Sequence, residues 1–255
     1  LARIVPILNF NSESFSLLDG GPSNRRSLLD RLLFHVEQQY LDTLKKFYRV
    51  LKQRNMLLRN RAAKNQFAGW DQQMAGEVRK LDIFREKCVS TINRYLQAMP
   101  ISPFIGHLQL EYYRGWHRDI EFEKFLTDNW LRDSDAGTTT AGPHRAELRF
   151  KVNEKLAKTT VSRGQGKLII AAIVSAQARY LCDHGAERPI LLVDDLASEL
   201  DRNARKMAVD SLMDTKSQIF FTAIEATDLP NDLTDIAKMF HVEQGKILPL
   251  DSVGV

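Results

Sequence analysis

The stretch "PILLVDD", residues 189–195, constrains the fold more than any other part of the sequence. Its four consecutive apolar residues, Ile190 to Val193, predict a strand that is buried on both faces, as in a parallel sheet covered by helices. Ligands of open α/β sheets bind beyond the carboxyl ends of the strands, where Asp194 and Asp195 stand. Capping of the next helix is the alternative role, but a cap needs only one aspartate. The pair therefore favours a site for a metal ion and a nucleotide.

Composition sets wider limits on the class of protein. A chain of 255 residues with 44% hydrophobic residues can bury a core and has room for two domains. The hydrophobic content and the 27% of charged residues indicate a folded rather than a disordered protein. The net charge of +4 permits nucleic-acid binding without establishing it. No run approaches the ~18 apolar residues of a membrane span. Cys88 and Cys182 are expected to be buried thiols of a reducing compartment, so we expect a cytoplasmic protein without a membrane partner.

Helical periodicity dominates the first half of the chain. Apolar residues recur at steps of three, four or seven from Leu29 to Leu58, and again from Trp70 to Met99. These series predict two long amphipathic helices that pack antiparallel with their apolar stripes in contact. We expect the stripes to form core rather than a cofactor site.

The second half of the chain has an α/β pattern. Residues 108–116 and 144–152 alternate like strands, and residues 123–135 like one short helix. From residue 160 onward the order is helix, strand, helix and strand. A final hairpin is expected to turn at Gln244 and Gly245.

The stretch "SRGQGK" predicts a capped helix whose first turn can bind an anion. Ser162 and Gln165 have the spacing of a capping box. Capping does not account for Gly164 and Gly166, each of which costs up to ~1 kcal/mol in a helix relative to alanine. Glycine lets a ligand approach the backbone at a helix N-terminus, and Arg163 adds positive charge. Phosphate is the ligand that fits this arrangement.

A phosphate-binding loop of the pattern G-x-x-x-x-G-K-[ST] is missing from the sequence. Aligning the pattern on Gly166 and Lys167 puts Val161 at the first glycine and Leu168 at the serine or threonine. No other stretch fits. The phosphate-binding half of a nucleotide site is therefore not found in these 255 residues.

This combination of motifs resembles the ATP-binding-cassette (ABC) ATPases, and specifically the RecF family of DNA recombination and repair proteins. "SRGQ" is similar to the signature motif, "ILLVDD" to Walker B and "ASELD" to the D-loop. Further stretches look like RecF landmarks in RecF order: "GGPSNRRSLLD" (20–30), "LKQRN" (51–55), "YRGW" (113–116), "GPHRAELR" (142–149) and "MFHVEQGKI" (239–247). The resemblance spans essentially the whole chain.

The resemblance implies an α/β fold, the C-terminal lobe of an ABC-type ATPase head with an inserted, mainly α-helical arm domain. Residues 1–18 would end the N-terminal lobe of the head, 19–134 would form the arm, and 135–255 the C-terminal lobe. In RecF-like proteins the phosphate-binding loop precedes all three parts. We therefore expect a chain truncated at its N-terminus, in keeping with a strand that is already under way at Leu1.

The resemblance also implies roles for the motif residues, with ATP and Mg²⁺ as cofactors. Asp194 would hold Mg²⁺, and Asp195 would orient or deprotonate the water that attacks the γ-phosphate. Most of the superfamily has glutamate at the second position, and the shorter aspartate suggests slow hydrolysis. The signature residues would act in trans, on ATP held by the partner head of a homodimer: Ser162, Arg163, Gly164 and Gln165.

Other residues receive roles with open alternatives. Ser198 and Asp201 would lie in the D-loop at the dimer interface, although Ser198 could instead cap a helix that starts at Asp201. Thr222 ends a strand where many relatives place a histidine that senses the γ-phosphate. His144 could touch DNA or nucleotide, but ordering of its own loop is the favoured role.

Nucleic acid is the second expected ligand. Six basic residues are candidates for contacts with DNA phosphates, with a solvated helix face as the alternative: Arg25, Arg26, Lys45, Lys46, Arg49 and Lys52. The resemblance implies single-stranded, double-stranded or gapped DNA and recombination mediator proteins as partners. It further implies ATP-gated dimerisation, help in loading recombinase and a weak, DNA-stimulated ATPase activity. A structural DNA tether of the SMC type without turnover is one alternative, and a transporter-type ABC subunit is a weaker one.

Overall fold

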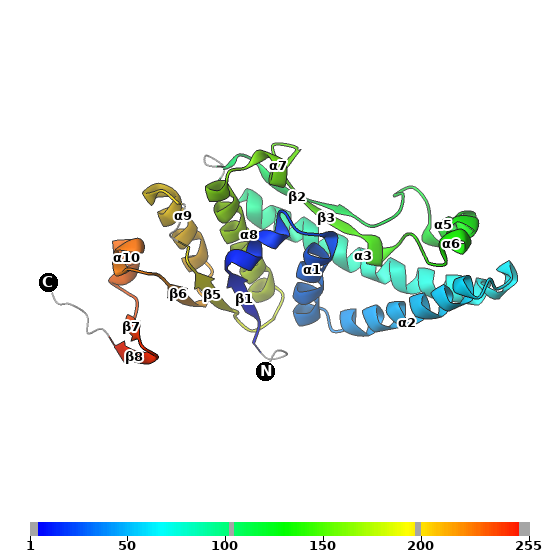
Figure 1. The fold of residues 1–255 in the computed structure, drawn as a ribbon, viewed down its shortest axis with the longest axis horizontal. Helices are drawn as coiled ribbons and strands as arrows, with labels where there is room; N and C mark the ends of the chain where they lie inside the picture. Colours follow the sequence, from blue (N-terminus) through cyan, green and yellow to red (C-terminus); the bar gives the residue numbers. More distant parts are fainter. Residues whose placement is uncertain (1–4, 102–104, 197–199, 250–255) are drawn as a thin grey trace.

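The computed structural model describes residues 5–101, 105–196 and 200–249 and has a head at one end and a long arm at the other (Figure 1). A parallel three-stranded sheet of order β1-β5-β6 lies in the head. Its strands are β1 (Ile7–Phe10), β5 (Ile190–Asp194) and β6 (Gln218–Thr222). The helices α8 (Arg163–Asp183) and α9 (Arg202–Met213) contact each other, and α8 also packs on β1. The expected order of helix, strand, helix and strand is confirmed.

The prediction that β5 is buried on both faces is wrong for the described residues. Leu191 and Val193 are buried, but Leu192 between them is 41% exposed. Ile7 and Phe220 lie on the same face of the two neighbouring strands and are 54% and 52% exposed. Helices thus cover one face of this sheet, and its other face carries exposed apolar side chains.

The first amphipathic series forms two helices rather than one. α1 (Pro22–Val36) packs against the head, where it contacts α8, and α2 (Tyr40–Arg59) runs out along the arm (Figure 1). Hydrogen bonds hold the corner between them, because the Tyr40 hydroxyl donates to Asp30 Oδ1 and the buried Arg85 guanidinium binds both groups. The apolar spacing continues through the break, which is why periodicity alone predicted a single helix.

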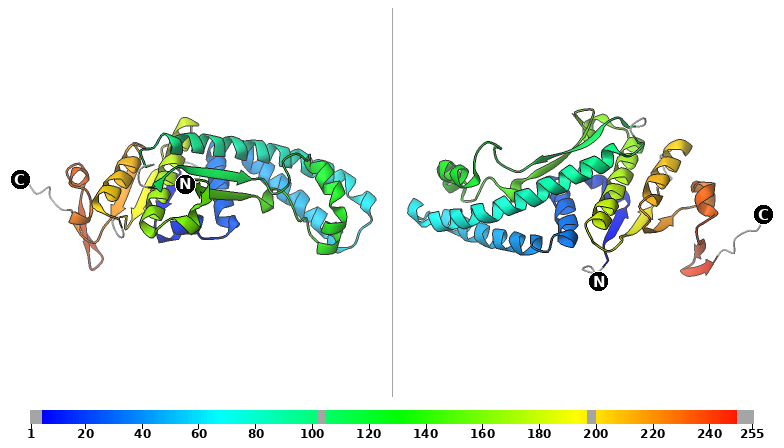
Figure 2. Two further views of the ribbon diagram at one scale, coloured as in Figure 1. Left: turned by 90° about the horizontal axis from the view of Figure 1, so that it is seen from above. Right: turned by 180° about the vertical axis from the view of Figure 1, so that it is seen from behind.

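The arm is an antiparallel pair of helices with two short helices near its tip. α3 (Ala68–Gln97) packs along α2, as predicted, and both views of Figure 2 show the pair side by side. Residues 123–135 form two short helices instead of the one expected, α5 (Phe122–Asp128) and α6 (Trp130–Ala136). Near the tip of the arm the Arg54 guanidinium is fully buried against carboxylates of α3 and α6.

A second, antiparallel sheet of order β2-β3-β4 lies beside α3. Its strands are β2 (Leu108–Tyr113), β3 (Glu147–Val152) and β4 (Lys155–Leu156), so both predicted strands are confirmed. The Asn93 amide of α3 closes the outer edge of β2, donating to Leu110 O at 2.8 Å and accepting from Leu110 N at 2.7 Å. The predicted domain boundary after residue 134 thus falls between two strands of one sheet.

Short elements complete the described chain. They are η1 (Ser12–Leu17), η2 (Lys64–Gln66), η3 (Pro143–Arg145), α7 (Ala157–Thr160), η4 (Ala226–Asp228), α10 (Asn231–Thr234), β7 (Phe240–Glu243) and β8 (Lys246–Pro249). The predicted hairpin is confirmed, since β7 and β8 pair across Gln244 and Gly245, both with the positive φ of a two-residue hairpin turn. In the part of the chain that the structure describes, no helix is long and apolar enough to cross a membrane.

Candidate functional site

The N-terminus of α8 has the predicted capping box. Ser162 Oγ accepts a hydrogen bond from the Gln165 backbone N–H at 3.3 Å, and Gln165 Oε1 accepts one from the Ser162 backbone N–H at 3.0 Å. Gly166 serves packing rather than ligand approach, because an added Cβ would lie 3.0 Å from the Phe15 ring of η1. The expectation that Gly166 opens the helix to a ligand is therefore wrong. Ser162 and Arg163 are exposed at the start of the helix.

The aspartate pair at the end of β5 is linked to the end of β6. The Thr222 hydroxyl donates to Asp194 Oδ1 at 2.5 Å and lies 3.4 Å from the backbone nitrogen of Asp195. Thr222 therefore orients the Asp194 carboxylate in this structure. Asp195 has a φ of 48°, a left-handed conformation that costs a non-glycine residue roughly 1 kcal/mol or more and that is frequent at functional sites.

Lys167 is a member of the site that the sequence reasoning missed. Its surrounding sequence does not fit the pattern of a phosphate-binding loop. Its side chain is nevertheless buried in the first turns of α8, and its Nζ donates a hydrogen bond to the backbone oxygen of Asp195 at 2.9 Å. This contact fixes the backbone at the left-handed aspartate. A lysine inside an otherwise apolar helix, close to its N-terminus, was the signal that could have identified it.

These groups surround one cavity of about 510 Å³. Both aspartates line it together with basic and polar side chains, and the complete set is Phe10, Asn11, Ser12, Phe15, Asp19, Arg163, Lys167, Asp194 and Asp195. Of the four signature residues only Arg163 reaches the cavity. Ser162, Gly164 and Gln165 do not line it. The structure therefore brings Arg163 to the two aspartates but not the other three signature residues.

Asp194 suits a Mg²⁺ ion that is completed by other ligands. Mg²⁺ in nucleotide sites uses one or two carboxylates, with phosphates and waters supplying the other oxygens. Asp194 offers one exposed carboxylate next to a hydroxyl. Among the described residues no three acidic, histidine or cysteine side chains gather as a self-sufficient metal site. The residues present therefore fit a metal ion that arrives with a nucleotide.

The D-loop residues lie apart from this cavity or outside the described chain. Asp201 is the N-cap of α9, and its Oδ1 accepts from the Ala204 backbone N–H at 2.8 Å. The alternative in which Ser198 caps this helix is therefore wrong. Ser198 itself lies outside the described residues, and the dimer-interface role of both residues stays a prediction.

His144 orders the loop in front of β3. Its Nε2 lies 3.0 Å from Thr139 O, and its ring packs on the Phe47 ring of α2. Burial lowers the pKa of His144 to about 4. A neutral ring whose Nε2–H donates to a carbonyl agrees with the favoured loop-ordering role.

Two of the six candidate DNA contacts have internal partners. Arg25 forms a bidentate ion pair with Glu147 of β3, at 2.8 and 3.0 Å, and Arg26 donates to Ala146 O at 2.8 Å. Burial alone would raise the pKa of Glu147, but the hydrogen bond and charge of Arg25 outweigh it and lower that pKa. Both arginines thus join α1 to β3, and we remove them from the set proposed to bind DNA.

The remaining four basic residues form an exposed stripe on α2. They make no hydrogen bond or ion pair with any other described residue. We call this set the α2 basic stripe: Lys45, Lys46, Arg49 and Lys52. It lies on the arm, whereas the cavity around the aspartate pair lies in the head.

The parallel sheet that ends in an aspartate pair, the capped helix beside it and the helical arm define part of an ABC-type ATPase head with an arm domain. No family model matches the chain. The sequence is 36% identical over 249 residues to the DNA replication and repair protein RecF of Vibrio campbellii, covering 97% of this chain and 70% of that protein. It is 38% identical over 254 residues to RecF of Shewanella halifaxensis, covering 98% and 69%. The chain belongs to the RecF family of DNA replication and repair proteins.

Solved structures agree with the fold. A structure of the recombination mediator protein RecF with ATP superimposes with a TM-score of 0.79 at 21% identity, covering 97% of this chain and 68% of that one. A second RecF structure, described as RecF-ATPrS, gives a TM-score of 0.78. The expected fold class, an ABC-type head with a helical arm, is confirmed.

Proposed function

We propose that this chain is the signature-bearing part of an ATP-dependent DNA-repair switch. The observation that carries the proposal is the cavity in which Asp194, Asp195, Arg163 and Lys167 meet. Membership of the RecF family and the RecF structures solved with ATP support ATP as the nucleotide. The proposal includes a phosphate-binding loop supplied by sequence that is not among these residues, because no stretch of the chain fits one.

Each side chain of the site has a proposed task. When Mg²⁺ is bound, it would neutralise phosphate charge, and Asp194, held by the Thr222 hydroxyl, would supply its protein oxygen. Asp195 would accept a proton from, or orient, the attacking water. Lys167 would keep the Asp195 backbone in place through its hydrogen bond to the carbonyl. If Thr222 senses the γ-phosphate, it would do so through its hydrogen bond to Asp194, because its hydroxyl already donates to that carboxylate.

The signature residues are proposed to act on a partner head. Ser162 and Gln165 lie at the exposed start of α8, outside the cavity of their own chain. A capped helix end that faces outward can receive an anion held by a second molecule. ATP would then join two heads, with Asp201 and the D-loop near the contact. The dimer is a proposal, supported by this placement and by the resemblance.

DNA is the proposed second ligand, bound by the α2 basic stripe. Its four side chains have no partners among the described residues and could track phosphates without reading bases. ATP-gated dimerisation on DNA, cooperation with recombination mediator proteins and recombinase loading complete the proposed function. A structural tether without turnover is the second candidate, because Asp195 is shorter than the usual glutamate.

One pair of variants tests the site in a protein that joins this chain to a phosphate-binding-loop lobe. Asp195→Asn should retain ATP binding, lower single-turnover hydrolysis at least ~100-fold by loss of the base, and accumulate an ATP-bound dimer in size-exclusion chromatography. Ser162→Arg should leave ATP binding by the monomer intact but prevent the dimer. The exposed Asp214→Asn is the matched control and should behave as the parent protein.

Three outcomes separate the alternatives. Full hydrolysis by Asp195→Asn would show that Asp195 is not the hydrolytic group. Loss of ATP binding by the Ser162→Arg monomer would show that the signature acts in its own chain. If the parent protein forms the ATP-bound dimer and shows no hydrolysis with or without DNA, the tether is the correct function.

A further inference from the structure

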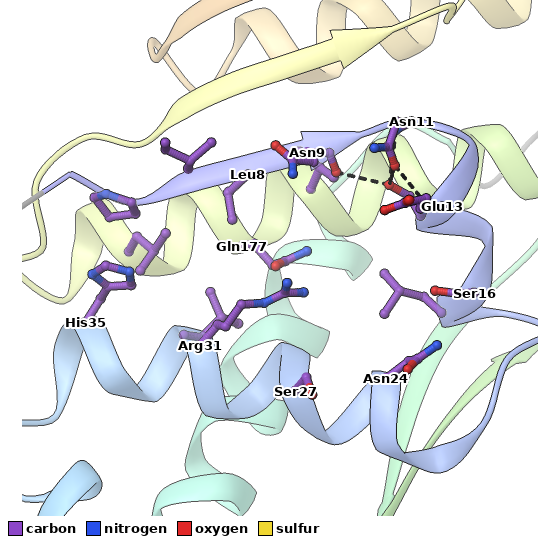
Figure 3. A pocket seen from close by; sticks show the side chains of 17 residues that line it. Leu8, Asn9, Asn11, Glu13, Ser16, Asn24, Ser27, Arg31, His35 and Gln177 are labelled. Carbon is purple, nitrogen blue, oxygen red and sulfur yellow. Dashed lines mark hydrogen bonds between the residues drawn. The ribbon is translucent and has the colours of Figure 1, made fainter. Parts of the chain in front are cut away.

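A second cleft lies on the other side of the β1–η1 turn, between β1, α1 and α8 (Figure 3). Its volume is about 610 Å³, and we call it the α1–β1 cleft. Asn11 lines both this cleft and the cavity around Asp194, but the other groups are separate. The proposed ATP chemistry uses none of the polar side chains that line the cleft from α1 and α8.

The backbone of β1 offers an unpaired strand edge to this cleft. β1 is the outer strand of the order β1-β5-β6, and Ile190 N donates to Pro6 O at 2.9 Å. Since alternate residues of a strand point their backbone groups to opposite edges, the groups of Ile7 and Asn9 face away from β5. Asn9 O accepts from Ser14 Oγ at 3.2 Å. The Asn9 N–H and both backbone groups of Ile7 thus face the cleft without a strand partner among the described residues.

A buried amide faces the same space from the floor. Gln177 of α8 is 6% exposed, and its carboxamide makes no hydrogen bond with any described residue. Figure 3 shows it between β1 and α1, directed into the cleft. Because this amide opens onto the cleft, it is available to hydrogen-bond a ligand there. A carboxamide both donates and accepts, as a peptide group requires.

Charge distinguishes the two sides of the cleft. Arg31 of α1 is its only lysine or arginine and has no carboxylate partner among the described residues. Its guanidinium extends toward the space below Gln177 in Figure 3. Burial lowers the pKa of the nearby His35, so that ring adds no positive charge at neutral pH. Glu13, the only acidic residue among the described ones that line the cleft, belongs to η1. The α1 side therefore favours a carboxylate.

We propose that the α1–β1 cleft binds an extended peptide segment of a partner protein that carries an acidic side chain. The segment would add to the free edge of β1 through main-chain hydrogen bonds, as peptides add to sheet edges elsewhere. Gln177 would bind one of its peptide groups, and Arg31 would pair with its carboxylate. The proposal does not rest on ATP or DNA binding.

Fluorescence anisotropy with designed peptides tests this site. The probe is a labelled, capped hexapeptide of alternating valine and threonine with one central aspartate, and its counterpart has asparagine at that position. The aspartate peptide should bind with a Kd below about 1 mM, and the asparagine peptide about tenfold more weakly, through loss of the charge-assisted pair. Binding should slow hydrogen exchange at the Ile7 and Asn9 amides.

Variants of the chain assign each contact. Arg31→Gln should weaken the aspartate peptide about tenfold and leave the asparagine peptide unchanged, because only the first has a partner for the guanidinium. Gln177→Leu should weaken both peptides equally and keep the fold, since the amide has no hydrogen-bond partner in the described part of the chain. The control is Arg132→Gln on α6, an exposed arginine that likewise has no partner among the residues described, and it should change neither affinity.

Clear results would overturn the proposal. Absence of binding by the aspartate peptide at millimolar concentration would do so, as would equal losses for both peptides in Arg31→Gln. Protection elsewhere in the chain with none at Ile7 and Asn9 would place the peptide at another surface. Circular dichroism of each variant separates a lost contact from a lost fold.

Discussion

The arm and the head use charged residues in opposite ways. In the arm, Arg54 is fully buried and lies 2.7 Å from carboxylate oxygens of both Asp71 and Asp133, so the protein supplies its own counter-charges. In the head, Asp194 and Asp195 are exposed beside a cavity, and one of them has a left-handed backbone. The buried ions of the arm define one arrangement of helices. The exposed ions of the head are left for ligands, and we expect them to contribute less to stability.

The largest effect should come from the arm. Arg54→Met removes one cation and leaves two buried carboxylates uncompensated, which we expect to lower the free energy of unfolding by about 3–5 kcal/mol. Urea unfolding measures this loss. Arg49→Met, an exposed arginine on the same helix, should change the free energy by less than ~0.5 kcal/mol. Similar values for the two variants would remove the contrast between arm and head.

A pH effect of intermediate size should arise where the arm meets the loop before β3. The pKa of His144 is about 4 in the folded chain because of burial, whereas an unfolded histidine titrates near its reference value of 6.5. Between these values the unfolded state binds more protons, so stability is complete above about pH 6.5 and falls as the pH drops toward 4. By pH 4 the loss should be about 3 kcal/mol.

Urea unfolding at neutral and at acidic pH measures this effect. His144→Gln should remove most of the difference between the two pH values. The exposed His107→Gln is the control and should leave the difference in place. An unchanged pH dependence in His144→Gln would assign the effect to other groups.

The smallest effect should come from the helix caps of the head. Asp201→Ala and Ser162→Ala each remove a side chain that accepts a backbone N–H of the first turn, which costs about 1 kcal/mol. Thermal unfolding measures both losses. A loss as large as that of Arg54→Met would show that the head depends on its polar contacts as strongly as the arm does.

Local patterns predicted most of the elements. The capping box of Ser162 and the hairpin turn at Gln244 depend on residues within a few positions of each other, and both are present. The strands β2 and β3 show the alternation expected from one buried face. These features follow from contacts that are local in the sequence.

Features that depend on distant contacts were missed. The apolar run of β5 predicted two covered faces, but which faces are covered depends on elements far away in the sequence. The corner between α1 and α2 depends on Arg85, a residue of α3. Lys167 and Asp195 are 28 positions apart, and Arg25 and Glu147 are 122 apart. No spacing rule connects such pairs, so neither the contact of Lys167 with Asp195 nor the internal role of Arg25 could be predicted.

The amide of Asn93 has a consequence for how copies of this protein can meet. An outer strand with free N–H and C=O groups is a template on which another chain can add, and this is a common route to aggregation. Asn93 makes the two hydrogen bonds with Leu110 that a foreign strand would make, and Arg118 donates to Tyr112 O further along β2. Even at high protein concentration, copies of the protein should therefore not join into one continuous sheet through this edge.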